Sequence, residues 1–328
     1  MSRRGWVLFL AMGLIWGVPY LLIKVAVEEL APSVLVLART TLAGLLLLPL
    51  AWARGHLRPL LPAWKPILAF TVVEICVPWL LLGVAEQRLS SSLTGLLIAA
   101  VPLVGAGLVW VGGARLTGDP DRPDLVRAVG LLVGLAGVAA LVGFEVGSGD
   151  TSAVLAIAVV VVCYAVGPMI LARWLSHLPG LGVVTVSLLA AAVLYLPMGV
   201  AQAPSTWPAA QVAWSVVGLA VVCTALAFVV FFALIAEVGP TRSTVITYLN
   251  PAVALVLGVL VLDEAFTAVT ATGFGLILAG SVLATRRRPT GPAVPAARAP
   301  QDRRPSGPAA TDRSVDCGTL SSTTVAEP

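Results

Sequence analysis

Charged residues are scarce in this sequence. Only 11% of its 328 residues are Asp, Glu, Lys or Arg, and 59% are hydrophobic, whereas about a quarter of an ordinary soluble domain is charged. The composition therefore excludes a typical soluble domain and is typical of a polytopic membrane protein. The pI is about 9.1. However, the basic residues lie in short segments between apolar runs, so we expect no nucleic-acid partner.

Motifs for metal binding, disulfide formation and catalysis are also missing. The four cysteines, Cys76, Cys163, Cys223 and Cys317, have neither paired nor metal-ligand spacing, so we expect no disulfide, no metal and no cofactor. The sequence contains no HExxH motif and no GxxxxGK[ST] phosphate loop, and no histidine lies within an apolar run. An integral-membrane enzyme is therefore the less favoured class of function, and we expect no ATP hydrolysis by the chain itself.

Long uninterrupted apolar runs are what the sequence does contain. Most are 17 to 21 residues long, the length that a helix needs to cross a bilayer, and they lack the alternation of porin strands. We predict an all-α integral membrane protein with ten transmembrane helices. The predicted spans are residues 6–23, 34–53, 65–82, 91–111, 125–142, 152–171, 181–200, 211–234, 243–262 and 269–285.

Lys and Arg are distributed unequally between the two ends of these spans. Thirteen lie on one side, three lie on the other, and four lie in the C-terminal tail. The positive-inside rule then predicts a cell-membrane protein with both termini in the cytoplasm. We expect the N-terminal run to be a retained span rather than a cleaved signal, because it lacks a small-residue cleavage site.

The chain repeats itself. Pro102 and Pro251 each lie inside a predicted span, 149 residues apart, and residues 83–102 match residues 232–251 at the same offset. Each half holds five spans. Because five is odd, the halves cross the membrane in opposite senses, as in many secondary transporters. We predict a first repeat over residues 1–143, a second over residues 144–288, and a Pro- and Ala-rich disordered tail over residues 289–328.

These features resemble the EamA family of the drug/metabolite transporter superfamily. The resemblance is carried by WGVPYLLIK at residues 16–24, by LNPAVALVLGVLVLDEAFT ending at Thr267, and by glycine-rich segments at residues 130–137 and 273–280. It implies a ten-helix transporter with cytoplasmic termini and alternating access. Members move amino acids, other metabolites, sugars or drugs, commonly outward. Arg115 departs from the family, which often has Glu at the end of both motif copies, so we do not expect symmetric roles for the two ends.

Glu74 is the only acidic residue expected deep within a span. A charge at the centre of a bilayer costs several kcal/mol unless it is neutralised, paired or hydrated. Glu74 is therefore a candidate for proton coupling or for binding a substrate amine. The sequence equally leaves open a structural pairing with Arg39, which lies in the second predicted span.

Small and polar residues follow one face of the ninth predicted span, at steps of three and four residues. We predict that Ala254 and Gly258 pack closely against a neighbouring helix. An amide that faced lipid would cost free energy. We therefore predict that Asn250, together with Thr247 one turn earlier, lines a substrate cavity.

Aromatic residues and prolines complete the candidate site. Trp16 and Tyr20 lie one helical turn apart, and Tyr164 occupies the position of Trp16 in the second repeat. Such rings can bind an organic cation or an amino-acid side chain, although packing is their commoner role. Prolines within spans are candidate kinks or hinges that shape the cavity. These are Pro19, Pro78, Pro102, Pro168 and Pro251.

The predicted function is secondary transport, specifically proton-coupled or facilitative export of small metabolites, with amino acids as the leading class. Alternating access, direction and proton coupling are implied by the resemblance. The alternative within this class is a carrier that exports drugs or organic cations. The expected partners are a small-molecule substrate, the lipid bilayer and protons. A homodimer stays open, because lipid-facing and dimer-facing apolar surfaces look alike in a sequence.

Overall fold

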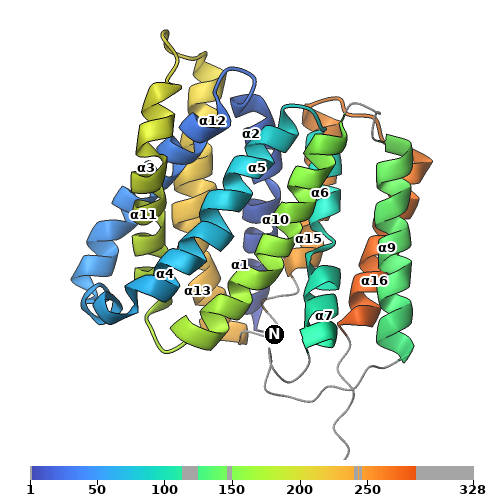
Figure 1. Cartoon of the computed structure of the whole chain (residues 1–328), viewed down its shortest axis with the longest axis horizontal. Helices are drawn as coiled ribbons and strands as arrows, with labels where there is room; N and C mark the ends of the chain where they lie inside the picture. Colours follow the sequence, from blue (N-terminus) through green and yellow to red (C-terminus); the bar gives the residue numbers. More distant parts are fainter. Residues whose placement is uncertain (1, 113–124, 146–149, 240–242, 244–245, 286–328) are drawn as a thin grey trace, which may run out of the picture. The chain divides into compact units, whose positions relative to one another are not determined.

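The apolar runs fold into helices because a backbone inside a bilayer must satisfy its own hydrogen bonds. The computed structural model describes residues 2–112, 125–145, 150–239, 243 and 246–285. Within these ranges it contains helices and no strands (Figure 1). Eight helical segments are long and apolar enough to cross a membrane, and two shorter apolar helices bring the total in the described ranges to ten. The predicted all-α membrane fold is confirmed.

The first repeat is built from segments α1 to α9, and its third span also contains a 3₁₀-helix and a π-helix. The bounds are α1 Arg3–Gly17, α2 Pro19–Ala26, α3 Pro32–Ala53, η1 Arg58–Ala63, α4 Trp64–Phe70, η2 Thr71–Cys76, α5 Val77–Glu86, α6 Ser91–Ile98, α7 Val101–Gly112 and α9 Leu125–Glu145.

The second repeat is built from segments α10 to α16. The bounds are α10 Thr151–Ile170, η3 Leu171–Leu175, α11 Gly180–Ala201, α12 Ala210–Ala220, η4 Val221–Leu226, α13 Ala227–Val238, α15 Ile246–Val261 and α16 Ala268–Ala284. Arg115 and the predicted tail lie outside the described residues.

A π-helix occurs at the middle of the third span in both repeats, η2 in the first and η4 in the second. A π-helix carries one extra residue per turn and often marks a functional position. Each third span is also longer than the apolar run from which it was predicted. The first covers Arg58–Glu86 and the second covers Ala210–Val238, 29 residues each. The predicted runs, 65–82 and 211–234, end too early because a helix can continue through polar residues near the membrane surface.

The two repeats are interleaved rather than packed as separate halves. Extensive contacts join α3 to α11, α5 to α10, α6 to α15, α1 to α15 and α2 to α12, and each of these pairs takes one helix from each repeat. The fifth and tenth spans, α9 and α16, also lie side by side (Figure 1). They approach through glycine: a Cβ atom added at Gly280 would overlap the backbone of Gly134. Polar side chains on the helices of one repeat can therefore contact helices of the other repeat.

The protein core and the lipid-facing surface are both apolar, as expected for a membrane bundle. The two largest buried clusters draw on both repeats, and Tyr164 packs against both of them. Large apolar side chains are also exposed on the outside of the bundle, for example Leu132 at 68% and Val193 at 69%. Buried polar side chains are consequently the exception, and they identify the candidate site.

Candidate functional site

Glu74 lies in the π-helix η2, near the middle of the third span. Its side chain lies against α10 of the second repeat, because a Cβ atom added at Gly167 would overlap the Glu74 carboxylate. The Oε2 atom is buried and has no hydrogen-bond partner among the described residues, although the side chain as a whole is partly accessible. The carboxylate therefore lies between the repeats with an acceptor that the described protein groups leave unused.

Arg39 is not an ion-pair partner of Glu74 in the structure. Its Nε donates a hydrogen bond of 2.8 Å to Thr224 Oγ1 in η4. Its Cζ lies 3.6 Å from the centroid of the Trp79 ring, which is a cation–π contact. The side chain is only 7% exposed. The structural pairing that the sequence left open is therefore absent from this arrangement, and each of the two charges has a different surrounding.

Two of the predicted aromatic residues lie near these charges. Tyr164 on α10 is within electrostatic range of both Glu74 and Arg39. Tyr20 on α2 is buried and is also within electrostatic range of Arg39. Tyr164, Tyr20 and Glu86 therefore lie within electrostatic range of Arg39, and Glu74 lies within electrostatic range of Tyr164.

Trp16 lies in a different environment. Its ring packs on α13, with its centroid 4.8 Å from that of Phe231 and 6.2 Å from that of Phe228. It belongs to a separate apolar cluster that includes Met12 and Leu234. Packing between α1 and α13 thus accounts for its position.

Asn250 lies on α15, and its backbone oxygen comes close to α1 at Gly17. Its Oδ1 atom is buried and has no hydrogen-bond partner among the described residues. Thr247 lies one turn earlier and is partly buried. Further along the same helix, Ala254 packs against Gly95, and Gly258 faces Ser92 and Glu264. Asn250 therefore has an unused acceptor, whereas the later small residues lie at helix contacts.

The five prolines lie in three kinds of position. Pro19 and Pro102 begin the second part of an interrupted span, after Val18 and after Ala99–Ala100 respectively. Pro78 is the second residue after η2, and Pro168 lies in the last turn of α10, three residues before η3 begins. Pro251 lies within the continuous helix α15. Four of the five thus accompany a break or a π-helix, which are the places where a transmembrane helix can bend.

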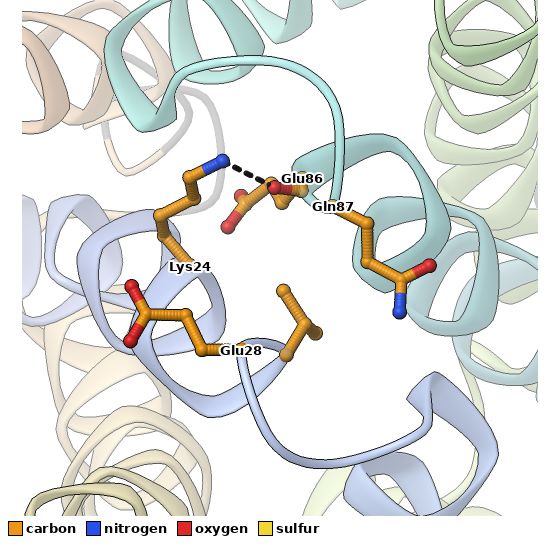
Figure 2. A pocket seen from close by; sticks show the side chains of 5 residues that line it. Lys24, Glu28, Glu86 and Gln87 are labelled. Atoms are coloured by element: carbon orange, nitrogen blue, oxygen red, sulfur yellow. Dashed lines mark hydrogen bonds between the residues drawn. The ribbon is translucent and has the colours of Figure 1, made fainter.

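A pocket of about 280 Å³ opens between the ends of the first and third spans. This end is called outer here, after the side of the membrane that the Lys and Arg distribution predicts. Figure 2 shows Lys24, Glu28, Glu86 and Gln87 around it. The Lys24 ammonium donates to the backbone oxygens of Glu86, at 2.6 Å, and of Leu89, at 2.9 Å. Both carboxylate oxygens of Glu86 are buried without a hydrogen bond in the described part of the chain.

Glu264 connects the two repeats at the same end. Its Oε1 accepts a hydrogen bond of 2.7 Å from the Ser91 amide, and its Oε2 accepts one of 2.8 Å from the Ser92 amide. These amides open α6, where a helix has unsatisfied donors and a partial positive charge. A second pocket, of about 270 Å³, lies beside this contact and is lined in part by Arg88 and Asp150.

Sequence reasoning missed the roles of Arg39, Glu86 and Glu264. Each is a charged residue within or at the end of a span, and that unusual position was the available signal. Their partners, however, lie far away in the sequence: Thr224 is 185 residues from Arg39, and Ser91 is 173 residues from Glu264. The pattern of apolar runs carries no information about such distant contacts.

Comparison with known proteins supplies the family. The model of the EamA-like transporter family matches residues 3–143 and again residues 151–286. The Escherichia coli (strain K12) protein named "Uncharacterized inner membrane transporter YedA" is 28% identical over 292 residues, which is 87% of this chain and 92% of that one. The Bacillus subtilis (strain 168) "Uncharacterized transporter YvbV" is 24% identical over 273 residues, 81% and 86% of the two chains.

The fold comparison agrees with these matches. A protein of known crystal structure superposes with a TM-score of 0.62 over 87% of this chain and 98% of its own, at 22% sequence identity. The helical architecture, the doubled family match and the relatives therefore lead to one conclusion: the chain is a multi-pass membrane transporter that belongs to the EamA-like transporter family.

Proposed function

We propose that the protein exports small metabolites, amino acids first among them, by alternating access, and that Glu74 couples this movement to protons. The observation that supports the proposal is the Glu74 carboxylate, which lies against Gly167 of the other repeat with a buried and unpartnered oxygen. A carboxylate at this depth is stabilised by a bound proton or by a bound cation. Competition between the two for one carboxylate couples the flux of cargo to the flux of protons.

The position of the carboxylate fits this role. Elements that move relative to each other in alternating access belong to different repeats, and Glu74 in η2 faces α10 across such a boundary. The π-helix that carries Glu74 and the proline that follows it, Pro78, provide a local place for the helix to bend. The carboxylate that would release the proton or the cation thus lies in the same segment where the helix can bend.

The test is transport by the full chain reconstituted in proteoliposomes. Vesicles take up a mixture of labelled L-amino acids with and without a pH gradient, and wild type is compared with Glu74→Gln. We expect the gradient to drive accumulation in wild type. We expect the variant to lose the driven part while keeping exchange at equal pH, because the amide has the same shape but cannot exchange a proton. A gradient effect of equal size in both proteins contradicts the coupling role.

Asp263→Asn is the matched control, because it makes the same carboxylate-to-amide change outside the site. Asp263 is exposed and has a φ of 53°, a left-handed conformation that asparagine adopts readily. This variant is expected to accumulate amino acids like wild type. If no amino acid moves in any variant, the cargo assignment is wrong, and the membership of the chain in a transporter family is unaffected.

Export of organic cations is the second candidate function. It is favoured by the same carboxylate together with Tyr164, since an anionic group beside an aromatic ring attracts a desolvated cation. The same vesicles test it with labelled tetraphenylphosphonium. Gradient-driven movement of this cation, and no movement of amino acids, would favour the second function over the first.

A further inference from the structure

The outer pocket beside Lys24 contains a carboxylate without a partner. Glu86 is the last residue of α5 and lines this pocket of about 280 Å³. Both of its carboxylate oxygens are buried and accept no hydrogen bond from the described residues. In Figure 2 its side chain points toward the space that Lys24, Glu28 and Gln87 surround. A buried carboxylate without donors costs free energy, so the pocket favours a ligand that supplies donors or a positive charge.

Lys24 does not neutralise this carboxylate. Its ammonium donates to the backbone oxygens of Glu86, at 2.6 Å, and of Leu89, at 2.9 Å. It forms no ion pair with a carboxylate of the described residues. The two oxygens lie at the C-terminal end of α5, where a helix has unsatisfied acceptors and a partial negative charge. The positive charge of Lys24 is therefore directed at the backbone, and the Glu86 carboxylate is left without a counter-ion.

Glu264, at the same end of the bundle, has the surroundings of a structural carboxylate. Its two oxygens accept from the Ser91 and Ser92 amides at 2.7 and 2.8 Å. Glu86 has no such donors in the described part of the chain, although its side chain is 0% exposed. Helix capping therefore accounts for Glu264, and no comparable contact accounts for Glu86.

The architecture that the two repeats share does not require a charge at this place. The repeat aligns Glu86 with Ile235 and Lys24 with Ala172. An apolar residue thus satisfies the helix packing at both positions in the second repeat. The ammonium and the carboxylate of the outer pocket belong to the first repeat alone, so they serve a purpose that the fold itself does not impose.

The charges around the pocket favour a cation. Two carboxylates, of Glu28 and Glu86, line it together with the Lys24 ammonium and the neutral Gln87 amide. A ligand with one ammonium group would balance the second carboxylate and supply up to three N–H donors. The volume of about 280 Å³ lies just below the range of about 300–1,000 Å³ that is typical of sites for drug-sized ligands. The pocket therefore suits a small ligand.

We propose that the outer pocket is a binding site for the ammonium group of a small organic solute, with Glu86 as the main acceptor and Glu28 as the second carboxylate at the rim. The inference goes beyond the proposed function, because it adds a second site at the outer end and does not depend on Glu74. A simple amine and an amino acid share the ammonium group. The amino acid also has a carboxylate, and Lys24 has a third N–H donor besides the two that bond the backbone.

The experiment compares four probes of similar size that differ in charge: n-propylammonium, L-alanine, propionate and propan-1-ol. Binding to the purified full chain in detergent micelles is measured near neutral pH and at constant ionic strength, from the concentration-dependent rise of the thermal unfolding midpoint. We expect n-propylammonium to bind at least about tenfold more tightly than propionate or propan-1-ol, the change expected for one charge-assisted contact.

L-alanine distinguishes the two sources of the ammonium group. Tighter binding of L-alanine than of n-propylammonium assigns the pocket to amino acids, with Lys24 as the partner of their carboxylate. The reverse order assigns the pocket to simple amines. Either order supports an ammonium site, provided that both bind more tightly than propan-1-ol or that n-propylammonium alone does.

Three variants locate the site, each made in wild type and in Glu74→Gln so that binding at Glu74 is not counted. Glu86→Gln should weaken the binding of n-propylammonium at least about tenfold. Glu28→Gln should weaken it about two- to threefold, because solvent screens an exposed charge. Glu29→Gln is the matched control: its carboxylate accepts from the Ala209 amide at 2.9 Å and does not line the pocket, so binding should be unchanged.

Size-exclusion profiles establish which variants are folded, and the exposed Glu28→Gln carries the test if Glu86→Gln does not fold. Equal binding of n-propylammonium and propan-1-ol would overturn the proposal, as would equal binding of n-propylammonium by wild type and folded Glu86→Gln. The pH-gradient assay separates these failures from failure of the proposed function. If the pocket binds no amine while the gradient still drives Glu74-dependent accumulation, the ammonium site is refuted and proton-coupled export stands.

Discussion

Replacement of Glu264 tests whether the outer ends of the two repeats are held together by one carboxylate. Glu264 follows α15 in the second repeat and bonds the Ser91 and Ser92 amides of α6 in the first, at 2.7 and 2.8 Å. Hydrogen bonds to a charged acceptor contribute about 1.5–3 kcal/mol each. Ser91 and Ser92 are buried, so water replaces the lost carboxylate poorly.

We expect Glu264→Ala to lower the free energy of unfolding by about 2–4 kcal/mol, since the second of two bonds to one carboxylate adds less than the first. Glu264→Gln keeps one acceptor oxygen, so its loss of unfolding free energy should be about half that of Glu264→Ala. The measurement is equilibrium unfolding in mixed micelles, monitored by circular dichroism. The N-cap of α6 is independent of Glu264, because Ser90 Oγ accepts from the Leu93 amide at 3.1 Å, so the helix itself is retained.

A double-mutant cycle with Ser91→Pro isolates the contact. Proline removes the amide that Glu264 Oε1 accepts from, and it is favoured at the first position of a helix. The preceding residue, Ser90, has the extended conformation (ψ 154°) that proline demands. The loss of unfolding free energy caused by Ser91→Pro should therefore be smaller, by at least about 1 kcal/mol, in the Glu264→Ala protein than in wild type. Additive costs, or a Glu264→Ala variant within about 0.5 kcal/mol of wild type, would refute the proposed connection.

Two further predictions concern packing and the outer pocket. Gly280→Ala places a methyl group against the backbone of Gly134 and should destabilise the protein by about 1–3 kcal/mol. The control, Gly275→Ala on the same helix, meets open space and should leave the stability unchanged. Equilibrium unfolding in mixed micelles measures both variants. Lys24→Met removes two hydrogen bonds to the carbonyls at the end of α5 and should cost about 1–3 kcal/mol, whereas Lys65→Met, near the exposed Trp64 ring, should leave the unfolding curve unchanged.

The helices could be predicted from the sequence because bilayer thickness translates directly into the length of apolar runs. The repeat could be predicted because Pro102 and Pro251 occur in matching surroundings. The lengths of the apolar runs and the repeated sequence depend on local pattern alone. The glycine-rich segments contributed only to the resemblance, and the structure adds that Gly134 and Gly280 meet between α9 and α16.

The π-helices and the polar partners could not be predicted in the same way. Thr71–Cys76 and Val221–Leu226 are apolar segments whose composition resembles that of the α-helices around them. The partner of Arg39 depends on how α3 packs against η4, which is a tertiary contact. Glu74 stood out because it is a charge in an apolar run, but its neighbour Gly167 did not, since nothing local distinguishes it from the other glycines of the chain.

Thr224→Val tests whether one hydrogen bond between the repeats holds Arg39 in place. Arg39 Nε in α3 donates to Thr224 Oγ1 in η4 at 2.8 Å, and the Arg39 side chain is buried. The change keeps the shape of the side chain but removes the acceptor, so we expect the free energy of unfolding in mixed micelles to fall by about 1–3 kcal/mol. Thr224→Ser keeps the hydroxyl and should therefore lose less stability. A Thr224→Val variant that unfolds like wild type would refute this role of the bond.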